Sequence, residues 1–232
     1  MMFQGFELNR LIIQIVTLLF AVTVHEVAHG WVAFRLGDGT AKWAGRLTLN
    51  PIKHLDPMGS ILLPLMLIFF RSPVVFGYAK PVPVNFRNLK NHRRDTILVS
   101  LAGVSANLLL ALGCGLMAQI LLELRFLWVS PMLRGFVLDF FLILAYSVFI
   151  NTILAIFNLI PIPPLDGSRV LSMALPARYA SAFSQIERYG MFILFFLLFT
   201  GTLNGVISFF VDPALHLFLG NEGLLVFFRT MR

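Results

Sequence analysis

The sequence predicts an all-α membrane protein that crosses the bilayer several times. Hydrophobic residues make up 58% of the chain and charged residues 12%, whereas a soluble domain carries about 25% charged residues. The apolar residues form runs long enough to cross a bilayer, and most basic residues lie between these runs. We therefore expect a polytopic fold of about five to six transmembrane or re-entrant helices, with a small membrane-associated β-ribbon.

Charge and cysteine content exclude several other classes of protein. The formal net charge is +7, which in a soluble protein would suggest a nucleic-acid partner. Here the basic residues flank apolar runs, so cytoplasmic loops and anionic lipid headgroups explain them better, and no nucleic-acid partner is expected. Cys114 is the single cysteine, so neither a disulfide framework nor a thiolate metal site is expected. Residues 1–10 lack the features of a cleaved signal peptide, so the first helix should be retained.

The first apolar run, residues 8–36, contains an H-E-x-x-H motif formed by His25, Glu26 and His29. In a helix, residues four apart lie on one face, so the two histidines can place two imidazole nitrogens on one metal ion. Glu26 lies on the adjoining flank, where its carboxylate could accept a proton from metal-bound water.

A motif this short can also arise by chance on the solvated face of a soluble helix. The apolar setting favours a metal site instead, because each ionisable group at the centre of a membrane helix costs roughly 2.5–3.5 kcal/mol. A divalent cation would offset the cost of placing three such groups in one turn.

The stretch after the first span is expected to be irregular, because the prolines in residues 38–57 preclude a continuous helix. His54 and Asp56 lie together in it and could fold back toward the metal as a lid or a support. An ordinary interfacial loop is the competing interpretation. Residues 58–70 are apolar but short for a span, so we expect a segment that enters the membrane and returns.

Residues 73–86 are rich in valine, aromatic residues and proline, a composition that predicts an extended edge ribbon. The free backbone groups of such a ribbon could add a strand of substrate. A plain interfacial loop is the alternative. The basic residues in the stretch 87–95 are expected to lie on the cytoplasmic side.

Two further spans are expected at residues 96–124 and 135–159. The first contains Asn107, a lone amide in apolar surroundings. Such a group either forms an interhelical hydrogen bond or takes part in an active site. The second span carries Asn158 at its end.

A proline-rich stretch follows this last span, with Pro161, Pro163 and Pro164 close together. These prolines preclude a helix, and non-helical backbone at membrane depth is tolerated only beside protein or a wet cavity. Asp166 comes directly afterwards and could provide a third metal ligand. The alternative is that Asp166 is the N-cap of a helix over residues 167–175.

The remaining chain is expected to add accessory helices. Residues 177–188 are amphipathic, which is typical of an interfacial helix. Residues 189–200 and 203–219 are apolar, and form either one bent span with an interfacial piece or two short spans. The whole chain is expected to be one membrane-embedded domain, with its core in about residues 8–175 and accessory helices in residues 176–232.

Three motifs together resemble the site-2 protease family of intramembrane zinc metalloproteases. Residues 25–29 match the family's H-E-x-x-H, residues 103–107 resemble its G-x-x-x-N stretch, and residues 158–167 match its N-x-x-P-x-P-x-L-D-G motif without a break. Many relatives have proline after the glycine of the middle motif, where this chain has Val104. The resemblance covers residues 8–175 and suggests a minimal form of the family, without a PDZ or CBS domain.

The resemblance implies roles for four residues. His25, His29 and Asp166 would hold one zinc ion (Zn²⁺) per chain, and Glu26 would be the general base and acid in peptide-bond hydrolysis. The substrate would be a peptide bond in or near a transmembrane helix of another membrane protein, as in regulated intramembrane proteolysis.

The resemblance also implies contacts with the substrate. Asn107 and Asn158 would position the substrate or stabilise the tetrahedral intermediate. Phe76, Gly77 and Tyr78 would belong to an edge strand that pairs with the unwound substrate.

Two rival functions remain open. A metal-ion transporter could use His25, His29 and Asp166 as a transit site, although such a protein would be expected to have a second ligand cluster or repeated halves. A non-catalytic scaffold could bind membrane helices, although a purely structural metal site has no need of Glu26. In each case we expect a multi-pass protein of a prokaryotic inner membrane.

Overall fold

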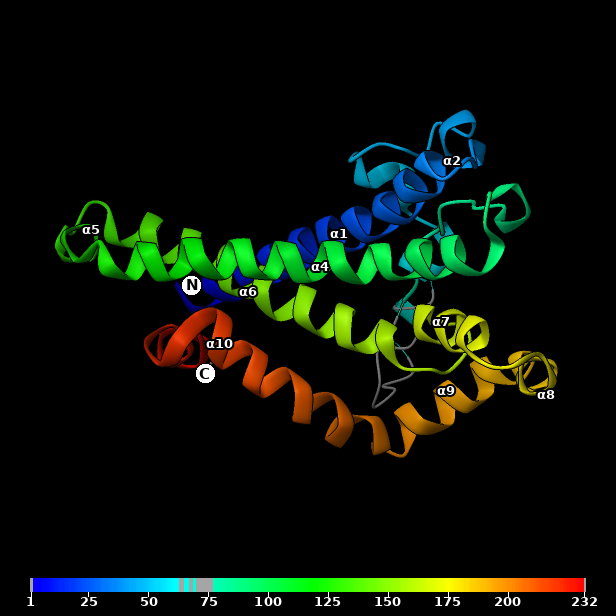
Figure 1. Ribbon diagram of the computed structural model, residues 1–232. Coiled ribbons are helices and arrows are strands. Elements are labelled where there is room, and N and C mark those ends of the chain that lie inside the picture. The colour runs from blue at the N-terminus through cyan, green and yellow to red at the C-terminus, as the bar shows by residue number, and fades with distance from the viewer. Residues whose placement is uncertain (1, 63–64, 67–68, 70–76, 232) are drawn as a thin grey trace.

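The computed structural model describes residues 2–62, 65–66, 69 and 77–231, and these residues are predominantly helical (Figure 1). In chain order the helices are α1 (Met2–Arg35), α2 (Thr40–Trp43), η1 (Pro51–His54), η2 (Pro57–Leu62), η3 (Phe86–Asn88), α4 (His92–Glu123), α5 (Arg125–Val129), α6 (Arg134–Leu159), α7 (Asp166–Ala174), α8 (Ala177–Glu187), α9 (Gly190–Phe199) and α10 (Thr202–Met231).

Within these described residues, four helices are long and apolar enough to cross a membrane. They are Leu8–Arg35 of α1, His92–Glu123, Arg134–Leu159 and Thr202–Thr230 of α10. Helices α8 and α9, bent by 66° relative to each other, form a fifth candidate. The expected set of several membrane-spanning helices is therefore confirmed.

Helix α4 lies at the centre of the bundle and packs against α1, α6 and α10. The largest apolar core fills the space between α4, α6 and α10, and Phe141 and Phe227 are fully buried in it. The Gln14 side-chain amide donates a hydrogen bond to the Tyr146 hydroxyl, which joins α1 to α6. Both termini lie with α5 at one end of the bundle, and α2 and α7 lie at the other (Figure 1).

The prediction of a β-ribbon is wrong, because no residue that the structure describes belongs to a strand. Residues 73–76 of the expected ribbon lie outside the described part, and residues 77–85, here called the strap, are irregular. The strap's backbone N–H groups bond to other partners: Tyr78 to the Gly59 carbonyl, Lys80 to the His54 carbonyl, Val82 to the Glu26 carboxylate and Asn85 to the Asp38 carboxylate. Pro81 and Pro83 have no backbone N–H. The strap therefore has too few donors to form the continuous row of hydrogen bonds that joins two β-strands.

The two apolar stretches near the C-terminus form separate helices. Gly201, with φ at 71°, separates α9 from α10. Helix α10 then runs past Pro213 to Met231, with a break in its helical geometry at Gly220. The part after this break is anchored in the core by Phe227, whose ring lies 5.0 Å from that of Tyr146.

Helix α7 is fixed to the start of α4 by an arginine. The Arg93 guanidinium donates hydrogen bonds to the carbonyls of Met173 (2.6 Å) and Ala174 (3.0 Å). These carbonyls belong to the last turn of α7, where they have no partner within the helix. The short helix that begins with Asp166 is thus held at its far end.

Asp38 connects the end of α1 to the strap. Its fully buried carboxylate accepts hydrogen bonds from the N–H and hydroxyl of Thr40, from the Asn85 N–H and from the Asn88 side-chain amide. Burial alone would raise the pKa of Asp38, but these hydrogen bonds lower it below its ordinary value. Asp38 is therefore ionised and its position is set by donors on several sides.

Replacing Asp38 by asparagine should destabilise the fold. A carboxamide directs N–H groups toward one of these donors and leaves it unpaired, at a cost of about 1–3 kcal/mol. The measurement is the denaturant midpoint of the detergent-solubilised protein and of Asp38→Asn.

The pH dependence provides a further check on Asp38. Because the pKa is lowered in the folded protein, the stabilisation is present above the unfolded pKa of about 3.9 and is lost as pH falls through the folded pKa. The difference between wild type and Asp38→Asn should narrow below about pH 4. A difference that grows on acidification would contradict this assignment.

Candidate metal centre

Three ligand-type side chains meet where α1 and α7 approach each other. His25 and His29 lie one turn apart on α1, and Asp166 is the first residue of α7. The two Nε2 atoms are 3.0 Å apart, and each is 3.1 Å from Oδ2 of Asp166. Within the described part of the chain, this is the one cluster of His, Cys, Asp or Glu side chains that could hold a metal ion.

Asp166 reaches the histidines because α6 stops at Leu159. Pro161 cannot continue a helix, and the chain turns back before α7 begins. Gly167 makes this turn possible, since a Cβ there would lie 2.2 Å from the Leu159 carbonyl oxygen. The N-cap of α7 is Leu165, and no side chain caps this helix. The structure therefore does not favour the alternative that Asp166 is the N-cap.

The second nitrogen of each imidazole is engaged by α4. Nδ1 of His29 donates a hydrogen bond to the Val99 carbonyl (2.7 Å), and Nδ1 of His25 donates one to Oδ1 of Asn107 (2.6 Å). A neutral imidazole that donates from Nδ1 has its lone pair on Nε2. Both Nε2 lone pairs consequently face the Asp166 carboxylate.

This arrangement fits a zinc ion. Three acceptor atoms converge without a hydrogen between them, which is unfavourable unless a cation or added protons lie among them. Their separations of 3.0–3.1 Å are close to the roughly 3.3 Å expected between ligands of a tetrahedral zinc ion with bonds of about 2.0–2.1 Å. Nitrogen and carboxylate oxygen are also ligand types that zinc accepts.

Gly103 allows α4 to approach the two imidazole rings. A Cβ at this position would lie 2.4 Å from Nε2 of His29 and 2.6 Å from Cε1 of His25. Both distances are far shorter than a van der Waals contact, so any side chain here would displace the rings. The close contact explains why the middle motif has glycine at this position.

Glu26 lies in the same pocket as the three ligand-type residues. The pocket has a volume of about 340 Å³, and its wall includes His25, Glu26, His29, Asn158, Asp166 and Arg169. Oε2 of Glu26 accepts a hydrogen bond of 2.7 Å from the Val82 N–H of the strap. The carboxylate is therefore held in a defined position beside the imidazoles.

The two asparagines singled out in the sequence occupy different places. Asn158 lines the pocket, and its side-chain amide donates to the Leu154 carbonyl (2.9 Å). Asn107 is fully buried behind His25. Of these two asparagines, only Asn158 thus lines the pocket.

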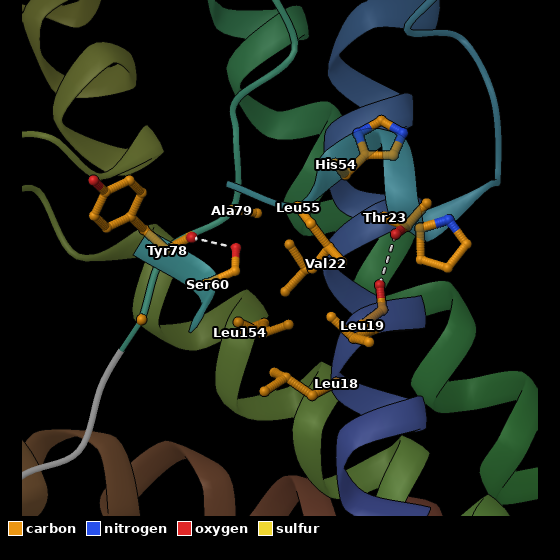
Figure 2. A pocket seen from close by; sticks show the side chains of 12 residues that line it. Leu18, Leu19, Val22, Thr23, His54, Leu55, Ser60, Tyr78, Ala79 and Leu154 are labelled. Atoms are coloured by element: carbon orange, nitrogen blue, oxygen red, sulfur yellow. Dashed lines mark hydrogen bonds between the residues drawn. The ribbon is translucent and has the colours of Figure 1, made fainter. Parts of the chain in front are cut away.

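The other predicted positions that the structure describes do not line this pocket. Phe76 is outside the described residues, while Gly77, Tyr78 and His54 line a second, apolar cavity of about 330 Å³ (Figure 2). His54 is buried and donates from Nε2 to the Thr48 carbonyl. Asp56 accepts hydrogen bonds from the N–H groups of Met58 and Gly59 and so caps η2.

Sequence reasoning missed several groups at this site. The Val82 N–H and the Val99 carbonyl are backbone groups, which carry no signal in residue identity. The Oδ1 of Asn151 accepts a hydrogen bond from Asn107. Its only sign in the sequence was that it is a second amide in the apolar span of residues 135–159. Arg169 follows the Asp166 motif by three residues, so its place on the pocket wall could have been inferred from helical spacing.

Comparison with known proteins identifies a protein family over most of the chain. The family profile described as peptidase family M50 matches residues 13–201. YwhC of Bacillus subtilis, provisionally named a zinc metalloprotease, is 38% identical over 229 residues, which cover 99% of this chain and 96% of YwhC. No solved structure matches this chain.

Mycobacterial proteins are also similar. Rip2 of Mycolicibacterium smegmatis, which carries a zinc-metalloprotease name of the same provisional kind, is 32% identical over 80% of this chain and 66% of Rip2. Rip2 of Mycobacterium tuberculosis H37Rv is 30% identical over 81% of this chain and 66% of that protein.

Adding a methyl group at Gly103 should weaken metal binding. The new Cβ of Gly103→Ala would push the His25 and His29 rings away from Asp166, because it would overlap both. We expect a loss of zinc affinity on the order of 10-fold or more, as for other changes that displace a ligand. The measurement is competition for zinc with a chromophoric chelator.

Gly113→Ala provides the matched control for this change. Gly113 is in the same helix, and a Cβ there would meet no atom within 4 Å. It should leave zinc affinity unchanged and favour the helix slightly. Equal zinc affinity in both variants would contradict the close contact at Gly103.

Proposed function

Because the chain belongs to peptidase family M50, we propose that His25, His29 and Asp166 hold its zinc ion and that Glu26 is its general base and acid. The protein is an intramembrane zinc metalloprotease with several helices long enough to cross a bilayer. The observation that carries the assignment of residues is the convergence of His25, His29 and Asp166 in the pocket that also contains Glu26.

The chemistry combines the metal with one carboxylate. When bound, zinc supplies a Lewis acid and lowers the pKa of a coordinated water toward about 7. Glu26 accepts a proton from the attacking water and returns a proton to the leaving amine. The Val82 N–H holds Oε2 of Glu26, and we assign the proton exchange to the other oxygen, Oε1.

We also propose that Asn158 contacts the substrate. Its side chain lines the pocket, and one hydrogen of its amide is used by the Leu154 carbonyl. The second hydrogen can be donated to the carbonyl oxygen of the scissile bond. Such a bond stabilises the negative charge that develops on this oxygen during attack.

The apolar cavity beside the site supports a membrane-helix substrate. Leu18 and Val22 of α1 line this cavity (Figure 2) and lie on the helix face that leads to Glu26, eight and four residues further on. Tyr78 lies across the cavity from α1 (Figure 2), and Gly77 also lines the cavity. We propose that an apolar side chain of the substrate occupies this cavity while the adjoining peptide bond enters the pocket.

The distribution of charge supports an orientation in the membrane. The metal centre includes the start of α7, at the end of the bundle that also holds α2 (Figure 1). The connection from α1 to α4, which begins with α2 at this end, carries basic residues that include Lys53 and Arg87. Basic loops remain on the cytoplasmic side. We propose that the site opens toward the cytoplasm of a bacterial cell, since the relatives are bacterial.

The rival functions have less support. A transporter would require further ligands along a path, and the described residues contain one cluster of this kind. In a silent scaffold, Glu26 would serve only to hold the Val82 N–H of the strap, which does not require a carboxylate beside His25, His29 and Asp166.

Replacing Glu26 by glutamine should separate catalysis from metal binding. The carboxamide cannot accept the proton, so cleavage of a transmembrane-helix reporter in reconstituted vesicles should fall by roughly 10²- to 10⁴-fold. Bound zinc, measured by elemental analysis, should remain near one ion per chain because His25, His29 and Asp166 are intact.

The matched comparison for Glu26→Gln is Asp166→Asn, which should lose both zinc and cleavage because a ligand charge is removed. Cleavage by Glu26→Gln at the rate of the wild type would rule out its role as general base. Zinc retained fully by Asp166→Asn would remove Asp166 from the ligand set.

Filling the apolar cavity should reduce activity without affecting the metal. Leu18→Trp places a larger side chain in the cavity (Figure 2), and we expect kcat/KM for the transmembrane reporter to fall roughly 10-fold, with zinc content unchanged. Leu109→Trp, at an exposed position of α4, is the control and should behave as the wild type. Equal activity in the two variants would show that the cavity does not receive substrate.

A further inference from the structure

Behind His25 lies a row of buried amides that links α1 to α6. Oδ1 of Asn107 accepts from His25, and Nδ2 of Asn107 donates to Oδ1 of Asn151 (2.7 Å). Nδ2 of Asn151 in turn donates to the Ser147 carbonyl one turn earlier in α6 (2.8 Å). Asn107 is 0% exposed and Asn151 is 1% exposed. We call these two side chains and the Ser147 carbonyl the amide relay.

The polarity of the amide relay is set at its far end. A backbone carbonyl only accepts hydrogen bonds, so the Asn151 side chain must turn its NH₂ group to Ser147 and its oxygen to Asn107. That oxygen requires a donor, so Asn107 must present its own NH₂ group. The Ala21 carbonyl favours the same orientation, since it also accepts from Nδ2 of Asn107 at 3.4 Å.

The consequence of this polarity appears at His25. With its NH₂ group turned to Asn151, Asn107 presents an oxygen to the imidazole, and that oxygen requires a hydrogen on Nδ1. The Nε2 lone pair of His25 then faces His29 and Asp166. An Asn107 side chain turned the other way would instead place the hydrogen on Nε2, where it would block a metal ligand.

The two histidines depend on different kinds of support. Nδ1 of His29 donates to the Val99 carbonyl, a backbone group whose polarity is fixed. Nδ1 of His25 donates to an amide that could present either of its ends. Only His25 therefore needs further residues to define its tautomer.

From this geometry we propose that Asn151 is a positioning residue for metal binding, which acts through Asn107 to hold His25 in its zinc-binding tautomer. The proposal rests on the proposed role of His25 as a zinc ligand. It also gives Asn107 a supporting role behind His25. Partners of this kind typically change metal affinity or activity by 10- to 100-fold when they are removed.

The first experiment measures zinc affinity in the full-length, detergent-solubilised chain by competition with a chromophoric chelator. Asn151→Leu removes the acceptor while keeping a similar volume, and we expect its zinc affinity to fall on the order of 10-fold. Thr152→Val is the matched control. Thr152 is the next residue in α6, is fully buried, and has no hydrogen-bond partner for its hydroxyl among the described residues. Thr152→Val should retain the affinity of the wild type.

A rescue variant separates positioning from a general loss of packing. In Asn107→Asp the carboxylate presents an acceptor oxygen whichever way it turns, so Asn151 is no longer needed to orient it. The double variant Asn107→Asp/Asn151→Leu should therefore bind zinc more tightly than Asn151→Leu alone. The absorption spectrum of the cobalt-substituted protein should follow the same order, since it reports ligand geometry independently of cleavage.

The outcomes separate this inference from the proposed function. If His25→Ala loses zinc affinity while Asn151→Leu matches Thr152→Val, the metal site stands and the role of Asn151 is refuted. If the double variant binds zinc no better than Asn151→Leu, a defect in packing explains the loss and the relay is again refuted. If His25→Ala binds zinc as tightly as the wild type, both the ligand assignment and the inference fall.

Discussion

The direct contact between α4 and the imidazole rings of α1 determines where the rest of the site can lie. At Gly103 the backbone of α4 comes so near to the two rings that no side chain fits between them. Val99 and Asn107 are four residues before and after Gly103, on the same face of α4, so their oxygens reach the two Nδ1 atoms. With α1 and α4 fixed in this way, the start of α7 needs to supply only the carboxylate of Asp166.

The strap illustrates how polar backbone groups are satisfied in this fold without a sheet. Glu26 lies in α1, and its carboxylate accepts a hydrogen bond from the Val82 N–H of the strap. Asp38 follows α1 and accepts a hydrogen bond from the Asn85 N–H. The Arg46 guanidinium donates to the Lys80 carbonyl of the strap. In a low-dielectric setting, each backbone polar group needs a hydrogen-bond partner. In the strap, side chains and loop carbonyls provide the partners that a neighbouring strand would provide in a sheet.

The sequence was sufficient for the long helices and for the residues that converge on the metal centre. Apolar length located the main spans, and the spacing of His25 and His29 placed them on one helix face. The β-ribbon was wrong because alternating valine and proline describe an extended chain but do not identify its hydrogen-bond partners. Those partners, Glu26 and Asp38, are far away in the sequence. The direction of Asn107 was equally inaccessible, because one asparagine in a helix carries no information about which neighbouring helix it faces.

The difference in support between the two histidines bears on how the site can evolve. The partner of His29 is the main chain at Val99, which every amino acid except a helix breaker would supply in the same way. The partner of His25 is encoded by the codons of Asn107 and, behind it, Asn151. A substitution at Asn107 or Asn151 can therefore disturb the support of His25 alone, whereas a change of side chain at Val99 leaves the hydrogen bond of His29 in place.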